Sequence, residues 1–173
     1  MKIKPLYLVM LLAGMILCAC DDEKPNSTGD AEASQFVGNY EITIVTDSIK
    51  IEDQWYSAEF AASIGKTYPD MHGTMTITAT DTPNKVHVTT LVSETGANPY
   101  EYYVTDGTVT ADNTLILEPS TISLGEEYPT ILNFTYESIE AGEELHFKAH
   151  ALYNLWSTDY GYVLSNTAKK INE

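Results

Sequence analysis

Two histidines, His146 and His150, have a spacing that could do chemistry. On a helix this spacing would place both imidazoles on one face, where they could bind one metal ion. The surrounding residues instead alternate between polar and apolar, which predicts a strand, and four strand residues span about 13 Å at ~3.3 Å each. The pair therefore cannot share an ion. We predict solvent-exposed histidines, with a cross-strand partner such as His87 as the alternative.

The other groups that could do chemistry are carboxylates and hydroxyls. Glu126-Glu127 and Glu143-Glu144 are adjacent pairs, and adjacent strand residues point to opposite faces, so neither pair forms an acid and base dyad by itself. The sequence has no Gly-x-Ser-x-Gly nucleophile motif and no glycine-rich phosphate loop. Asp106 and Asp112 are the nearest candidates for a weak calcium site. We predict no catalytic residue, no metal site and no cofactor.

Aromatic side chains beside amide, hydroxyl and carboxylate groups are better candidates for binding. They gather in three stretches, residues 55–56, 100–103 and 153–162. Aromatic faces with polar neighbours suit a sugar ring or a flat apolar ligand. The alternative is that these rings pack against their own loops. From these stretches we predict four ligand-binding side chains: Trp55, Tyr102, Trp156 and Tyr160.

The chain that must position these rings is patterned for β-structure. From about residue 36, short runs rich in Val, Ile, Thr, Tyr and Phe are separated by turn residues, which is typical of an antiparallel all-β domain. Polar and apolar residues alternate in 74–80 and 144–153, which predicts one buried and one exposed face. We predict strands at 38–46, 48–57, 72–80, 84–93, 100–105, 114–118, 130–137, 144–153 and 161–168.

The connections between these strands are mostly short. Turn residues predict turns at 81–84, 95–99, 106–107 and 140–142. Residues 58–64, which end before Gly65, predict a short helix that could form a lid over one end of the sheet. Eight or nine strands with short turns favour a single antiparallel up-and-down β-barrel, with a β-sandwich as the alternative.

The first twenty residues are typical of an export signal. Two lysines precede an apolar run from Leu6 to Leu17, which matches a secretory signal. The run is too short for a membrane span, which needs about 20 apolar residues. It leads into the sequence Leu17-Cys18-Ala19-Cys20, which holds both cysteines of the chain.

This cysteine sequence resembles the bacterial lipobox, in which a small residue precedes the cysteine that receives the lipid. Cys20 fits this pattern because Ala19 precedes it, whereas Cys18 follows the bulky Leu17. The resemblance implies cleavage before Cys20 and lipidation of that residue. The alternative is a disulfide or metal site, but two residues apart the cysteines cannot meet disulfide geometry, and no histidine is near in sequence for zinc.

An acidic run, Asp21-Asp22-Glu23, follows the cysteine. It resembles the signal that carries many Bacteroidetes lipoproteins to the outer face of the outer membrane, whereas in enteric bacteria an Asp here would imply retention at the inner membrane. We predict a lipid-anchored protein of the outer membrane at the cell surface. The predicted organisation is a signal peptide at 1–19, a lipidated cysteine and flexible acidic tether at 20–35, and a β-barrel domain at 36–173.

The charge of the chain excludes several partners. Without the signal peptide it holds seven lysines, no arginine and 25 acidic residues, a net charge near −18. Nucleic acid and anionic phospholipid need clusters of Lys or Arg, so both are disfavoured. Bidentate clamping of a carboxylate or phosphate by an arginine is also unavailable.

The start of the predicted domain, Phe36-Val37-Gly38-Asn39-Tyr40-Glu41, carries a second resemblance. It resembles the Gly-x-Trp/Tyr start of lipocalin-like and calycin-like domains, which are common in Bacteroidetes lipoproteins. The resemblance extends over residues 36–173 as architecture and implies a barrel of about eight strands. It also implies that Tyr40 plugs the base of the barrel. Lys169 or Lys170 then takes the place of the arginine that packs over this aromatic in lipocalins.

Together these patterns predict a lipid-anchored, non-catalytic envelope protein that binds a small apolar or saccharide ligand at the barrel mouth. The first alternative is an accessory or structural subunit of an outer-membrane protein complex, which would expose a contiguous apolar patch. The second is an enzyme or inhibitor, which would hold at least two convergent titratable groups with perturbed pKa in a cleft.

Overall fold

The computed structural model describes residues 33–93, 98–124, 130–155 and 158–171. These ranges form an all-β structure with one short helix, as the sequence predicts. No helix within them is long and apolar enough to span a bilayer. The elements are β1 (Gly38–Ile51), β2 (Gln54–Ser57), α3 (Ala58–Ser63), β3 (Met71–Ala79), β4 (Lys85–Ser93), β5 (Tyr100–Val109), β6 (Thr114–Leu117), β7 (Ser120–Leu124), β8 (Thr130–Tyr136), β9 (Ile139–Glu140), β10 (Glu144–Leu155) and β11 (Thr158–Lys170).

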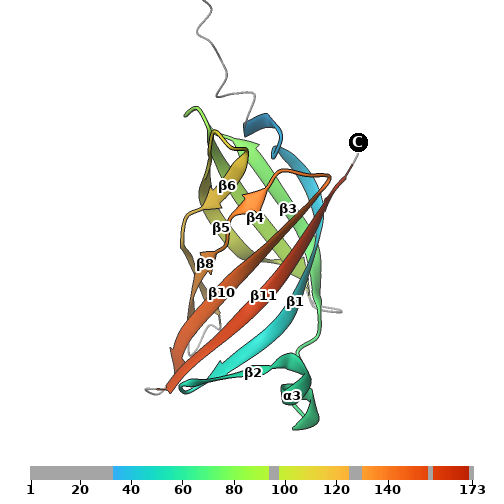
Figure 1. Ribbon diagram of the computed structural model, residues 1–173, viewed down its shortest axis with the longest axis vertical. Coiled ribbons are helices and arrows are strands. Elements are labelled where there is room, and N and C mark those ends of the chain that lie inside the picture. Colours follow the sequence, from blue (N-terminus) through green and yellow to red (C-terminus); the bar gives the residue numbers. More distant parts are fainter. Residues whose placement is uncertain (1–32, 94–97, 125–129, 156–157, 172–173) are drawn as a thin grey trace, which may run out of the picture.

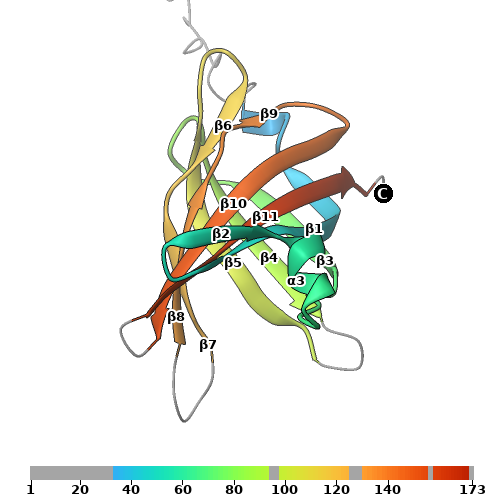
Figure 2. The ribbon, with the colours of Figure 1, turned by 60° about the horizontal axis from the view of Figure 1, so that its bottom comes forward.

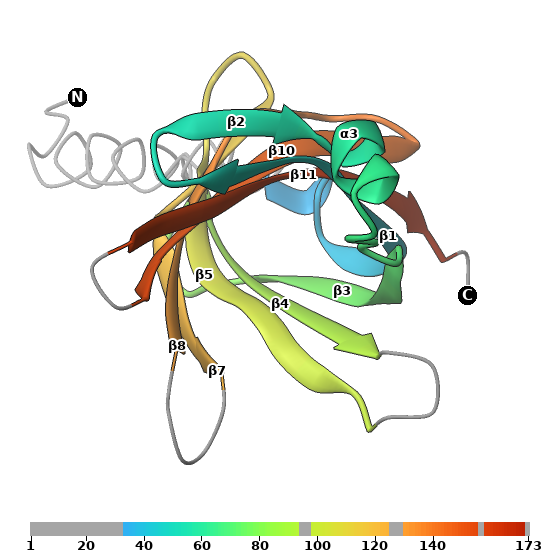
Figure 3. The ribbon, with the colours of Figure 1, turned by 90° about the horizontal axis from the view of Figure 1, so that it is seen from below.

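All strands belong to one antiparallel sheet with the order β7-β8-β10-β11-β1-β3-β4-β5-β6-β9, and β2 pairs with β1 outside this path. The sheet curls into a half-barrel (Figures 1 and 3). The β-sandwich alternative is therefore wrong, because a sandwich needs two sheets. The first long strand lies beside the last one, in a ladder that runs from Tyr40↔Lys170 to Ile51↔Tyr160.

Residues 114–124 connect the two sides of the curl. Within them β6 pairs with β5 and β9, and β7 pairs with β8. The break between β6 and β7 is held to β5 by two hydrogen bonds. Thr105 Oγ1 donates to Glu118 O at 2.6 Å, and Glu118 N donates to Asp106 O at 2.8 Å.

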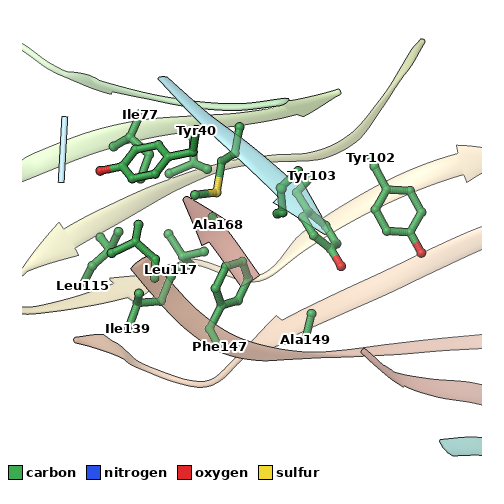
Figure 4. Close-up of a cluster of buried hydrophobic side chains, with 14 of the residues drawn as sticks. Tyr40, Ile77, Tyr102, Tyr103, Leu115, Leu117, Ile139, Phe147, Ala149 and Ala168 are labelled. Carbon is green, nitrogen blue, oxygen red and sulfur yellow. The ribbon is translucent and has the colours of Figure 1, made fainter. Parts of the chain in front are cut away.

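The inside of the curl is filled with apolar side chains at one end. Figure 4 shows Tyr40, Ile77, Leu115 and Ile139 turned toward one another from four strands, and all four are buried. Burying each such side chain contributes roughly 1.5–3 kcal/mol. This filled end rigidly joins β1, β3, β6 and β9.

The segment before β1 covers the filled end. Phe36 is fully buried and belongs to the same core. Gln35 Nε2 donates to Asn113 Oδ1 at 2.9 Å, which ties the segment to the turn between β5 and β6. Figure 2 shows this segment in blue beside β9, at the end of the sheet away from β2 and α3.

The predicted strands are confirmed to within a few residues, with three corrections. β1 continues to Ile51 where two strands were predicted, and only residues 54–57 form a second strand, β2. The short strands β7 and β9 were not predicted, and Glu140, which was placed in a turn, lies in β9. The predicted turn at Asp106-Gly107 is wrong, because both residues lie inside β5. Gly107 serves close packing there, since a Cβ on it would lie 2.7 Å from Leu115 Cδ1.

The predicted helix is confirmed as α3. Ser57 caps it, because its hydroxyl accepts a hydrogen bond from Phe60 N at 3.2 Å. Ala61 is fully buried, as is Ile49 on β1, and both lie outside the main core. Figure 3 shows α3 at the rim of the curled sheet, alongside β1 and β2.

Candidate functional site

An open cavity of about 700 Å³ lies at the end of the half-barrel where β2 and α3 are found. Figure 3 looks toward this end of the sheet. The apolar part of the wall comes from three strands, with Met71 on β3, Leu132 on β8 and Leu164 on β11. The core extends to this end through Tyr102, Leu132 and Leu164, and the space beyond these side chains is open to a ligand.

Five tyrosines dominate the lining, and they are contributed by the connection before β3 and by β5, β10 and β11: Tyr68, Tyr100, Tyr102, Tyr153 and Tyr162. Their rings contact one another in two groups. The Tyr162 ring packs edge-on against Tyr68 at 5.7 Å and stacks on Tyr153 at 5.9 Å between centroids. On β5, Tyr100 packs edge-on against Tyr102 at 6.2 Å.

A β-bulge places Tyr102 in the cavity wall. The register between β4 and β5 pairs Thr90 with Tyr103 but Leu91 with Glu101, which leaves Tyr102 as the extra residue. A bulge lets two successive side chains share one face, and both Tyr102 and Tyr103 are buried. Strict alternation would have turned one of the two rings outward.

Behind this wall lies a polar layer within the core. Thr90 Oγ1, Tyr103 Oη and Asn166 Oδ1 are buried and have no well-formed hydrogen bond among the described residues. Asn166 does donate through Nδ2 to Leu164 O at 3.1 Å. Buried polar atoms without partners cost free energy, so this layer is a weak point of the core directly behind the cavity.

Burial keeps the tyrosines of this region neutral. Desolvation raises the pKa of Tyr102 and of Tyr162 well above the ordinary value, and it raises the pKa of Tyr103 further inside the core. The pKa of Tyr136 rises to about 12 by burial, although its hydrogen bond with Ser120 opposes the shift. A phenol with a raised pKa is a poorer acid at neutral pH, so these hydroxyls offer hydrogen bonds and no ready proton.

Charged groups are sparse in the lining. Among the described residues that line the cavity, Asp70 and His72 are the only ionisable ones besides the tyrosines, and no lysine is among them. Asp70 is exposed at the rim. His72 Nδ1 lies 3.2 Å from Thr43 Oγ1 on β1.

Of the four predicted ligand-binding residues, the three that the structure describes are brought together only in part. Tyr102 lines the cavity, and Tyr160 stacks on the lining residue Tyr153 at 5.2 Å. Trp55 is 47% exposed on β2 and does not line the cavity. Trp156 lies outside the described residues.

The remaining lining tyrosines were missed by sequence reasoning, although a signal for most of them existed. Tyr100, Tyr153 and Tyr162 lie in the aromatic stretches from which other members were selected. Strand register would have placed Tyr153 and Tyr162 on the inner face, since Tyr162 pairs with the buried Ala151. Tyr68 follows the helix, and no local pattern indicates where its ring points.

At the filled end, the predicted plug is confirmed. Tyr40 is fully buried, and its hydroxyl donates to Phe36 O at 2.6 Å. Lys170 Nζ lies over the Tyr40 ring, 5.8 Å from its centroid, within the range of a cation–π contact. Lys169 instead lies 3.7 Å from Glu144 Oε1. Of the two lysines considered, Lys170 is therefore the one that packs over the aromatic.

The histidines lie on strands and face carboxylates. His146 and His150 on β10 are 3.6 Å from Glu144 and 3.5 Å from Glu137, so the prediction of exposed strand histidines is confirmed. The suggested partnership with His87 is wrong, because His87 lies on β4 and contacts Asp106 at 2.7 Å. In the described ranges no three His, Cys, Asp or Glu residues come together as metal ligands.

The predicted carboxylate pairs can be placed only in part. Glu144 lies on β10 beside His146 and Lys169. Glu126-Glu127 lies outside the described residues, as does Cys20. Asp112 accepts a hydrogen bond from Thr110 in the turn between β5 and β6.

Comparison with known proteins adds a distant structural likeness. No family model matches the chain, and no curated protein matches it. A crystal structure from Bacteroides fragilis, described as a "putative outer membrane protein", matches with 15% sequence identity and a TM-score of 0.43. The match covers 80% of this chain and 52% of the other, so this chain spans about half the length of that protein.

Proposed function

We propose that this protein is a lipid-anchored lipoprotein of the outer membrane, exposed at the cell surface, which binds a small apolar or saccharide ligand and catalyses no reaction. The cavity of about 700 Å³ at the open end of the half-barrel carries the proposal. Its size falls within the range of about 300–1,000 Å³ that is usual for small-molecule sites. Aromatic rings, aliphatic side chains and a few hydroxyls make up most of its wall, as in such sites.

The arrangement of the strands supports a lipocalin-like container. If β6 and β7 count as one interrupted strand, and β8 and β9 as another, the long strands number eight. Each then lies beside its neighbours in the chain, and β11 returns to β1. Tyr40 and Lys170 stand at one end in the places that the lipocalin resemblance implies, and the cavity lies at the other.

The position of the tether supports a ligand taken from outside the membrane. The lipobox-like sequence ending at Cys20 supports anchoring at the N-terminus. The described chain begins at Ala33, which is buried at the filled end, whereas the cavity lies at the opposite end with β2 and α3 (Figure 1). The chain that leads from the proposed anchor therefore enters the domain at the end opposite the mouth of the cavity, which leaves that mouth uncovered by the point of attachment.

The test is native mass spectrometry of the lipoprotein purified from its own host's envelope. We expect a retained small molecule on the wild-type protein and none on Leu132→Trp, because Leu132 lines the cavity and a larger ring would fill it. Ile131→Trp is the matched control, since Ile131 is the next residue of β8 and is 56% exposed. Equal occupancy of both variants, or an empty wild-type protein, would contradict the proposal.

A second candidate, an accessory subunit of an outer-membrane protein complex, is favoured by apolar side chains on β2 and α3. Trp55, Phe60 and Ile64 are each about half exposed near the rim. Crosslinking in intact cells tests this candidate. If a partner protein crosslinks to Leu132→Trp but not to Phe60→Ser, the result would favour the role of an accessory subunit over that of a ligand carrier.

A further inference from the structure

The charges at the cavity leave an anionic ligand without a partner. No lysine lines it within the described part of the chain, and the protein contains no arginine. Three described lysines are held elsewhere by carboxylates: Lys85 by Glu118, Lys148 by Asp47 and Lys169 by Glu144. A carboxylate, sulfate or phosphate group would therefore enter the cavity without a compensating charge, at a cost that burial increases.

Asp70 offers the opposite charge at the rim. Asp70 is among the residues that line the cavity and is exposed, and it makes no ion pair with any described residue. The mature chain carries a net charge near −18, which raises the local concentration of cations at its surface. A free carboxylate beside a concave aromatic wall favours a positively charged group.

The tyrosine rings supply the rest of such a site. The faces of neutral aromatic rings attract a cation within about 6 Å of their centroids, and alkylated ammonium groups are bound in this way by aromatic cages. Tyr153 stacks on both Tyr160 and Tyr162, so its faces are covered. The faces for a cation come from Tyr162, on the side away from Tyr153, and from Tyr68, which packs edge-on against Tyr162. Leu132 and Leu164 complete the wall with surface suited to an apolar body.

We infer that the cavity selects organic cations, with an alkylated ammonium group held against the tyrosine faces near Asp70 and an apolar body extending toward Leu132 and Leu164. This inference rests on the proposed function and specifies its ligand. Within the proposed ligand classes, it favours an apolar cation over a neutral saccharide.

The test compares the affinities of a cation, its uncharged isostere, an anion and a sugar for the full-length lipoprotein. The affinities are measured by titration calorimetry in a polyoxyethylene detergent. The probes are benzyltrimethylammonium, its uncharged carbon isostere neopentylbenzene, the anion benzenesulfonate, and methyl glucoside. We expect the ammonium probe to bind about tenfold tighter than its isostere and the anion not to bind. Added salt should narrow the difference in affinity between the ammonium probe and its uncharged isostere, because ions screen an exposed carboxylate.

Two pairs of variants separate the contributions. Asp70→Asn should weaken binding of the ammonium probe several-fold and leave the affinity for neopentylbenzene unchanged. Asp81→Asn, in the turn between β3 and β4, should change neither affinity. Tyr162→Leu should reduce the preference for the cation, and Tyr162→Phe should keep it, because phenylalanine retains the aromatic face. Thermal unfolding of each variant checks that the fold is intact.

The outcomes distinguish this inference from the function on which it rests. If neopentylbenzene or methyl glucoside binds as well as the ammonium probe, the cation preference is overturned while the ligand-binding function stands. If no probe binds and the protein from its host is also empty, both are overturned. Equal loss of charged and uncharged probes in Asp70→Asn would also overturn the role of Asp70.

Discussion

Single hydroxyl groups have very different roles in this core. The Tyr136 hydroxyl shares a hydrogen bond with Ser120 at 2.5 Å, which joins β8 to β7. The Tyr103 hydroxyl is buried nearby, with the two rings 5.5 Å apart, and its contact with the Asn166 side chain is not a well-formed hydrogen bond. An identical substitution at the two positions therefore tests how much each hydroxyl contributes.

We expect Tyr136→Phe to lower the free energy of unfolding by about 1 kcal/mol, because it removes a satisfied hydrogen bond. Tyr103→Phe should change the free energy of unfolding by less than about 0.5 kcal/mol, or raise it, because a poorly satisfied buried polar atom is removed. Urea denaturation measures both values. A larger loss for Tyr103→Phe than for Tyr136→Phe would show that the Tyr103 hydroxyl has a partner in solution.

The strands differ in how far their sequence determines them. Alternation of polar and apolar residues predicted β3 and β10 well, because each lies with one face toward the core. Tyr102 could not be assigned to a face, because the bulge depends on the register with β4. Gly107 was taken for a turn residue because Asp-Gly is a turn signal, and only the packing of Leu115 reveals its other use. The sequence pattern thus predicts the strands, while the register and packing between neighbouring strands determine which side chains line the cavity.

Gly73 on β3 marks the closest approach between neighbouring strands. A Cβ at this position would lie 1.9 Å from Leu91 O on β4, next to the register shift that accompanies the bulge. We expect Gly73→Ala to lower the free energy of unfolding by about 3 kcal/mol, because the strands must separate. The neighbouring exposed residue supplies the control, Thr74→Val, which should change it by less than about 0.5 kcal/mol. A well-folded, fully stable Gly73→Ala protein would mean that the two strands can shift apart freely.

At the scale of the whole molecule, three buried and two partly buried tyrosines determine its response to alkali. Burial raises the pKa of each above the ordinary value near 10: Tyr40, Tyr102, Tyr103, Tyr136 and Tyr162. Above pH ~10 the unfolded chain releases these protons while the folded chain retains them. The unfolded state then binds fewer protons, so stability falls as the pH rises.

We therefore expect the free energy of unfolding to fall from about pH 10 upward as these tyrosines ionise in the unfolded chain. Denaturation at a series of pH values measures this dependence. Tyrosinate absorbance in the ultraviolet should rise together with the loss of β-structure by circular dichroism. If all tyrosines ionised near pH ~10 while the β-structure persisted, the burial of these hydroxyls would be refuted.

The proposed lipid anchor belongs to the same scale, because it would hold the whole domain at a membrane. We expect Cys20→Ala to move the protein from the detergent phase to the aqueous phase in a phase-separation assay, since it removes the proposed lipid attachment site. Cys18→Ala should remain in the detergent phase, because Cys18 leaves with the signal peptide. Mass spectrometry of the mature N-terminus checks the cleavage site. The opposite behaviour of the two variants would assign the lipid to Cys18.

The pairing of β1 with β11 has a consequence for biogenesis. Asp47 on β1 accepts a hydrogen bond from Ser165 on β11, 118 positions further along the chain. Contacts of such high sequence separation form late and slow folding. If the chain is exported from its N-terminus as proposed, β1 can pair early with β3 but lacks its other partner, β11, until residues 158–170 have emerged. The strand order therefore leaves one side of β1 as an open edge that needs protection from aggregation until the last strand arrives.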